Sequence, residues 1–126
     1  MELMDEALDA EDAKLVTLAR GARERIRADH GAAIRDENGR TYAAADAVLP
    51  SMALSAIQVA AAQAWISGAR GLEAAVVITA NPDSVPDAAA LIDIGGIEVP
   101  VIVCTPDGAV VQVATAGKFS GIEPAP

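Results

Sequence analysis

The side chains that could carry out acid–base or metal chemistry are few in this sequence and lie far apart. The chain has one histidine, His30, and one cysteine, Cys104. Cys104 ends the apolar run "VPVIVC", so we expect a buried strand thiol there. For His30 we expect a local hydrogen bond at the entrance of a strand. No spacing brings together the three histidine, cysteine or carboxylate donors that a zinc site requires, so the sequence predicts no metal.

Other patterns that indicate chemistry are missing as well. Neither "GLEAAVV" nor "DIGG" has the glycine spacing of a phosphate-binding loop. A Ser–His–acid set is not legible, because its geometry is spatial and the chain has a single histidine. The formal net charge of −9 repels the phosphates of nucleic acids and of anionic membranes. We therefore expect neither nucleic acid nor membrane as a partner.

The composition is typical of one ordinary domain. The chain has 126 residues, of which 52% are hydrophobic and only 2% aromatic, so Ala, Val, Ile and Leu must build the core. The N-terminus is acidic and lacks the basic segment of a signal peptide, which favours a cytoplasmic location. We expect a flexible acidic N-terminus over residues 1–10, one domain over residues 11–116 and an extended or disordered tail over residues 117–126.

The first half of the domain reads as a helix, a hairpin and a second helix. "AEDAKLVTLARGARERIRAD" has apolar residues at helical spacing. Asn38-Gly39 is a hairpin signal because both residues tolerate positive φ, so we expect strands near residues 31–35 and 40–45. The second helix lies in "PSMALSAIQVAAAQAWISGARG". We expect it to be capped by Ser51, to end near Gly68 and to be buried on most sides. Its tryptophan, Trp65, is either a core anchor or an interface anchor.

The second half predicts a parallel strand pair. "LEAAVVITA" reads as a central strand, "NPDSVPDAAALIDIGG" as a loop and a short helix, and "IEVPVIVC" as the next strand. A strand–helix–strand unit places its two strands parallel. "TPDG" then makes a tight turn into a last strand, "AVVQVATA". The predicted fold class is α/β, a five-stranded mixed sheet flanked by helices in three layers.

Four stretches of this chain resemble the cytidine deaminase family. They are "LARGARERI", the hairpin "GAAIRDENGRTYAA", the helix "PSMALSAIQVAAAQAWISG" and the strand and turn "VPVIVCTPDG". They occur in the family's order and together span most of residues 12–115. The resemblance implies a cytidine deaminase-like fold.

The same resemblance implies that the family's catalytic set is replaced here. The family holds zinc with a Cys or His at the start of the second helix and two Cys in a Pro-Cys-x-x-Cys element, and a glutamate moves the protons. The first ligand falls on Ile57 and the glutamate on Val59. The two Cys fall on Asp87 and Ala90. The chain thus looks like a member without zinc-binding and catalytic motifs, and we expect no cofactor and no catalytic residue.

Two hypotheses of different classes follow. The first is a catalytically inactive, zinc-free protein that acts as a structural or protein-interaction module. Family members are usually dimers or tetramers with contacts through this second helix, so a homo-oligomer is implied, with Trp65 as a possible interface residue. A further protein partner stays open, and the sequence does not name it.

The second hypothesis is a nucleoside- or base-binding protein, or a divergent hydrolase, that uses the family's cleft. The polar residues that could line such a remnant cleft are Asp46, Ser51, Ser55, Asp83 and Asp87. Asp46 maps near the family's Asn-x-Glu, which contacts ribose. For each of these residues the simpler alternative is a helix cap, a favourable acid in the first turn of a helix, or a loop residue.

Overall fold

A five-stranded mixed sheet is the middle layer of the computed structural model, which describes residues 8–84 and 87–122. Its strands, in the order β2-β1-β5-β6-β7, are β1 (His30–Asp36), β2 (Thr41–Ala45), β5 (Leu72–Thr79), β6 (Pro100–Cys104) and β7 (Val110–Thr115). β5 and β6 are parallel, and the other neighbouring pairs are antiparallel. The predicted α/β fold with a five-stranded mixed sheet flanked by helices is confirmed.

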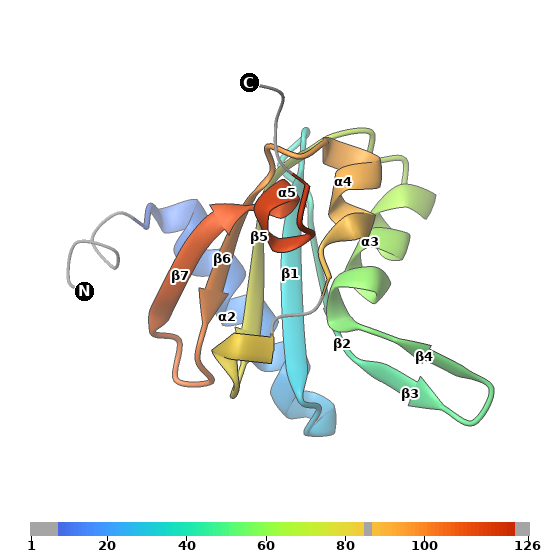
Figure 1. Cartoon of the computed structure of the whole chain (residues 1–126), viewed down its shortest axis with the longest axis vertical. Helices are drawn as coiled ribbons and strands as arrows, with labels where there is room; N and C mark the ends of the chain where they lie inside the picture. Colours follow the sequence, from blue (N-terminus) through green and yellow to red (C-terminus); the bar gives the residue numbers. More distant parts are fainter. Residues whose placement is uncertain (1–7, 85–86, 123–126) are drawn as a thin grey trace.

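Helices cover both faces of this sheet (Figure 1). The helices are α2 (Ala10–Ile26), α3 (Ala56–Ile66), α4 (Ala89–Gly95) and α5 (Ala116–Phe119). α2 lies on one face, and α3 and α4 lie on the other. Successive side chains of β1 point to opposite faces, so Ile34 packs on the α3 side and Ala33 on the α2 side. The domain therefore has two apolar layers that share one sheet.

α2 approaches the sheet closely. Asp9 caps the helix by accepting a hydrogen bond from the backbone N–H of Asp12, at 2.8 Å. A Cβ on Gly31 would overlap the carbonyl oxygen of Ala19 and lie 2.8 Å from the Cβ of Arg23, so only glycine permits this contact. The helix ends at Ile26 because the next residue adopts the left-handed conformation. This end is three residues earlier than the sequence predicted.

The segment before α3 is a second hairpin, which the sequence analysis missed. β3 (Ala47–Leu49) and β4 (Met52–Leu54) pair with each other and extend away from the body of the molecule (Figure 1). Ser51 lies in the turn between these strands and is not the cap of α3. The cap is Ser55: its Oγ accepts from the Gln58 N–H at 3.1 Å, and its own N–H donates to Gln58 Oε1 at 2.9 Å. This reciprocal pair starts the helix at Ala56.

α3 is buried along one face and not on most sides as predicted. Ile57 and its apolar neighbours on that face pack against the sheet, whereas Trp65 is 49% exposed and Ile66 is 83% exposed. Gly68, just past the helix, has a φ of +100°, which favours glycine at the exit. The apolar composition therefore exceeds what this single chain covers.

The C-terminal part differs from the expected extended or disordered tail. Ala116–Phe119 form α5, and Thr115 caps it by accepting from the Lys118 N–H at 3.2 Å. A Cβ on Gly117 would lie 2.9 Å from that of Ile97, so this turn packs tightly. Residues 123–126 of that tail lie outside the described residues, as do residues 1–7 of the expected flexible N-terminus.

Candidate functional site

The positions that correspond by resemblance to the family's catalytic set lie near the start of α3 and of α4. Ile57, in the first turn of α3, is 0% exposed and belongs to the core. Val59 is partly buried against the same core. A fully buried isoleucine offers only hydrocarbon to its surroundings, so this position binds neither a cation nor a proton.

The two remaining positions frame the start of α4. Asp87 is exposed, and its Oδ1 accepts hydrogen bonds from the Ala89 N–H at 2.8 Å and from the Ser120 hydroxyl at 2.9 Å. Ala90 is half-buried against the core. Pro86, expected to start the Pro-Cys-x-x-Cys equivalent, lies outside the described residues. Among residues 8–84 and 87–122, no three His, Cys, Asp or Glu side chains are grouped so that they could hold a metal ion.

A polar cluster instead joins the start of β1 to the start of α3. Asp46 Oδ2 lies 2.8 Å from His30 Nδ1 and accepts from the His30 backbone N–H at 3.1 Å. Its Oδ1 accepts from the Ala56 N–H at 2.8 Å. One carboxylate therefore binds the start of β1 and the first turn of a helix, and it fixes the orientation of the imidazole ring.

This cluster lines a hollow of about 380 Å³, here named the His30 hollow. Of the five residues expected in a remnant cleft, Asp46 and Ser55 line it. Its apolar wall comes from the β3–β4 hairpin: Val48, Ala53 and Leu54. Ser84 of the short 3-10 segment (Pro82–Ser84) also lines the hollow. The structure thus brings a histidine, a carboxylate and hydroxyls together beside an apolar surface.

The other three expected cleft residues lie elsewhere. Ser51 is exposed in the hairpin turn. Asp83 lines a separate hollow with Lys118 and Phe119. Asp87 is bonded to Ser120 at the start of α4. These three do not contribute to the lining of the His30 hollow.

A second hollow, of about 220 Å³, shares His30 and Ser84 with the first and is here named the Arg23 hollow. Arg23 comes from α2, and its Nε donates to the backbone carbonyl of Asp29 at 3.2 Å. Asn81 donates from Nδ2 to the Ser84 hydroxyl at 2.9 Å. Because the two hollows share residues, His30 stands between an apolar and a polar compartment.

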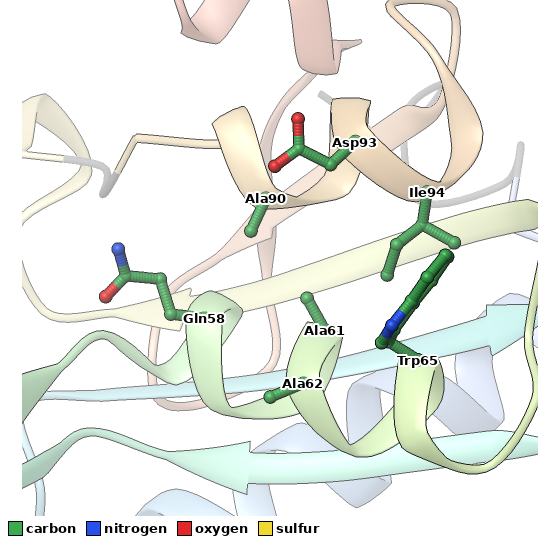
Figure 2. A pocket seen from close by; sticks show the side chains of 7 residues that line it. All are labelled: Gln58, Ala61, Ala62, Trp65, Ala90, Asp93 and Ile94. Carbon is green, nitrogen blue, oxygen red and sulfur yellow. The ribbon is translucent and has the colours of Figure 1, made fainter.

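An apolar groove of about 380 Å³ runs between α3 and α4 and is here named the α3–α4 groove (Figure 2). Trp65 and Ile94 lie side by side at one end, and Gln58 lies at the other. Ala61 and Ala62 of α3 and Ala90 of α4 line the groove between them, and among the described residues that line it Asp93 is the charged one. The guanidinium carbon of Arg70 lies 3.8 Å from the centroid of the Trp65 ring, a cation–π contact that holds the ring in place.

One buried carboxylate has a structural role. Asp36 is 1% exposed and accepts from the Tyr42 hydroxyl at 2.8 Å and from the N–H groups of Asn38 and Arg40 at 2.8 and 3.0 Å. Burial alone would raise the pKa of Asp36, but these hydrogen bonds outweigh burial and hold it below its ordinary value of 3.8. The same contact with Asp36 raises the pKa of Tyr42 above its ordinary value of 10.0. This cluster closes the β1–β2 hairpin.

His30 was expected to make a local hydrogen bond, and the expected cleft residues do not include it. Its carboxylate partner is 16 positions away. The hairpin contained the missing signal: with Gly31 opposite Ala45, the next pair outward is His30 and Asp46. The residue types alone do not reveal that His30 and Asp46 are neighbours, because this depends on the register of the hairpin.

These features define an α/β protein with a three-layer architecture and a polar cleft at the N-terminal end of α3. The cytidine deaminase-like family model matches residues 8–108. The chain therefore belongs to the cytidine deaminase-like family. No curated protein matches the sequence significantly.

Solved structures of cytidine deaminases have the same fold. The enzyme from Burkholderia pseudomallei aligns with a TM-score of 0.73 at 22% identity, over 84% of this chain and 93% of its own. The one from Mycobacterium leprae aligns with 0.66 at 21% identity, over 88% and 98%. The one from Bacillus anthracis aligns with 0.65 at 17% identity, over 91% and 89%. At these identities the likeness establishes the fold and not the activity.

Among the described residues, no helix is long and apolar enough to cross a membrane.

Proposed function

We propose that this protein is a zinc-free member of its family without deaminase activity, and that it works as a self-associating interaction module. The observation that carries the first half is Ile57. At the position that resembles the family's first zinc ligand, a fully buried hydrocarbon side chain is part of the core. A metal site needs nitrogen, sulfur or oxygen donors, and this residue has none.

The other positions of the family's set agree with that interpretation. Ala90 has no donor atom, and the Oδ1 of Asp87 already accepts two hydrogen bonds. Val59, where the family has its proton-transferring glutamate, packs on the core. The residues at these positions therefore do not fit a zinc ion.

The second half of the proposal rests on the exposed side of α3. Trp65 and Ile66 present a large apolar surface to solvent, and the α3–α4 groove lies directly beside Trp65. Exposed aromatic anchors next to an apolar groove are characteristic of protein–protein interfaces. A symmetric contact between two copies would place the Trp65 of each copy against the other and cover both grooves. A dimer or a tetramer satisfies this arrangement.

The experiment combines metal content, turnover and mass. Purified protein is expected to contain no stoichiometric zinc by mass spectrometry and to convert no cytidine by ultraviolet absorbance, with an active cytidine deaminase as the positive control. Zinc that survives purification together with turnover contradicts the first half.

Light scattering at micromolar concentration is expected to give a dimer or a tetramer. Trp65→Ser should shift it to the monomer, because it removes the apolar anchor. Val113→Ser is the matched control, since Val113 is exposed to a similar extent on β7, away from the groove. A monomeric parent protein contradicts the second half.

A second candidate function, a nucleoside- or base-binding protein, is favoured by the His30 hollow, because Asp46 and Ser55 line it as a remnant cleft requires. Cytidine, uridine and the free bases should then raise the midpoint of thermal unfolding in proportion to their concentration. The absence of any shift across this set contradicts the candidate.

A further inference from the structure

The orientation of the His30 ring determines which hydrogen bonds it can make in the cleft. Asp46 Oδ2 already accepts from the His30 backbone N–H, and it lies 2.8 Å from Nδ1. A carboxylate only accepts hydrogen bonds, so Nδ1 carries the proton of the neutral ring. Nε2 is then left as an acceptor. Within residues 8–84 and 87–122, no hydrogen bond reaches Nε2, although the ring lines both the His30 and the Arg23 hollows.

The ring is held and not free to rotate. Asp46 is anchored a third time by the Ala56 N–H of α3, so the carboxylate that orients the ring is itself fixed to two elements. Nε2 of this fixed ring is therefore a preorganised acceptor, which gains more from a ligand than a mobile one because less freedom is lost on binding.

The charges around the ring select against anions. Asp46 lines the His30 hollow, and the whole chain carries −9, so an anion is repelled. Arg23 lines the neighbouring Arg23 hollow and not the His30 hollow, so it does not offset this repulsion there. Any charged ligand would also lose hydration against the apolar wall, and an uncharged molecule avoids both costs.

The hydrophobic wall of the His30 hollow gives the rest of the ligand a place. Val48, Ala53 and Leu54 face the space next to the ring, and Val48 is 78% exposed in the absence of a ligand. Covering this surface releases water from apolar atoms, which favours binding. A ligand with one polar end and one apolar body fits both walls.

We infer that His30 and the β3–β4 hairpin form a binding site for a small uncharged ligand that has an apolar body and a hydroxyl or N–H group. The hydroxyl or N–H donates a hydrogen bond to Nε2 of His30, and the body lies on Val48, Ala53 and Leu54. Asp46 is a positioning residue, because it acts on the ligand through the ring. The inference rests on a ligand entering the cleft, as in the second candidate function, but it does not need that ligand to be a nucleoside.

The test uses matched small probes and the single histidine of the chain. In nuclear magnetic resonance titrations the ring signals of His30 are unambiguous, because the chain has no other histidine. Phenol carries a donor hydroxyl, anisole is the same ring with that hydroxyl methylated, and benzoate is the anionic probe. Phenol is expected to shift the His30 ring signals and to bind roughly fivefold more tightly than anisole, the effect of about one net hydrogen bond.

The ¹⁵N shifts of the ring give an independent readout. They should show the proton on Nδ1 in the free protein, and Nε2 should move most when phenol binds. In Asp46→Asn the ring loses the partner that fixes its tautomer, so the preference for phenol over anisole should fall toward one. Equal binding of the two probes to the parent protein, strongest binding of benzoate, or no shift at His30 overturns the inference.

The outcomes also separate this inference from the second candidate function. Nucleosides that stabilise the protein while phenol and anisole bind equally would leave a nucleoside site standing and remove the role of His30. Phenol binding through Nε2 without any nucleoside effect would do the reverse.

Discussion

The two ends of α3 have opposite chemistry although they belong to one apolar helix of 11 residues. At its start, the side chains of Asp46, Ser55 and Gln58 accept hydrogen bonds from the backbone N–H groups of Ala56, Gln58 and Ser55, respectively. At its end, Trp65 is half-exposed and Ile66 is 83% exposed, and Arg70 covers part of the indole ring. The first end is completed within the chain, and the second is not. If the protein self-associates as proposed, this contrast places the interface at the C-terminal end of α3.

The largest expected effect tests the buried end. Ile57→Ala should lower the free energy of unfolding by about 2–5 kcal/mol, because it removes buried methyl groups and leaves a cavity in the core. Urea unfolding followed by circular dichroism measures this. The matched control is Ile66→Ala on the same helix, which should change stability by less than about 0.5 kcal/mol in the monomer. Equal effects at the two positions would abolish the distinction between the two ends.

The next effect tests the polar cluster at the start of α3. Asp46→Ala leaves the N–H groups of His30 and Ala56 without their acceptor, so it should cost about 1–3 kcal/mol. Asp29→Asn is the control, because no hydrogen bond to the Asp29 side chain is found within the described part of the chain. If the two variants unfold at the same urea concentration, Asp46 does not hold the elements together.

A smaller effect, dependent on pH, concerns the β1–β2 hairpin that carries His30. The pKa of Asp36 is lower in the folded chain than its ordinary 3.8, so the folded state binds fewer protons and is favoured above that value. This stabilisation is complete above pH 3.8 and is lost as the pH falls through the lowered folded pKa.

Tyr42→Phe removes one of the donors to Asp36, so the pKa of that carboxyl should rise and acid unfolding should begin at a higher pH. A fluorescence titration between neutral pH and pH 2 measures the midpoint. Phe119→Tyr adds a hydroxyl on α5, outside the set of residues that hydrogen-bond to Asp36, and serves as a control that should leave the midpoint in place. An unchanged midpoint in Tyr42→Phe would contradict the assigned cause.

The smallest effect on the folded chain itself is expected at the exposed end. Ile66→Ser, next to Trp65, should change the stability of the monomer by less than about 0.5 kcal/mol when measured at a concentration where association is absent, since the side chain is 83% exposed. Its effect on the oligomer should be larger. A strong loss of monomer stability would assign Ile66 to the core and remove it from the interface.

Much of the fold was predictable because it depends on local patterns. Helical periodicity located α2, the Asn38-Gly39 signal located the first hairpin, and the strand–helix–strand order predicted the parallel pair β5–β6. The predicted start of α3 was several residues too early. Two serines, Ser51 and Ser55, are possible caps, and Ser51 was predicted. Ser55 is the cap in the structure, because Gln58 exchanges reciprocal hydrogen bonds with it.

The candidate site was predictable only in part, because it depends on register. Asn-Gly turns often place both residues at positive φ, but here only Gly39 does, at +82°. The Asp36 N–H donates to the Arg40 carbonyl, so the loop has three residues instead of two. A two-residue loop would have shifted the pairing by one position, and His30 would not face Asp46.

Hydrophobic spacing and turn residues were enough to predict the layers, because they act over short distances along the chain. The resemblance to the family implies that Ile57 and Val59 correspond to the positions of a ligand and a base in the family's pattern. The tertiary structure decided which polar residues meet. His30, Asp46, Ser55 and Ser84 come from four segments, and their proximity follows from the register of one hairpin and the packing of α3 on the sheet. It also decided that Trp65 faces solvent, because burial depends on what the rest of the chain covers and not on the residue itself.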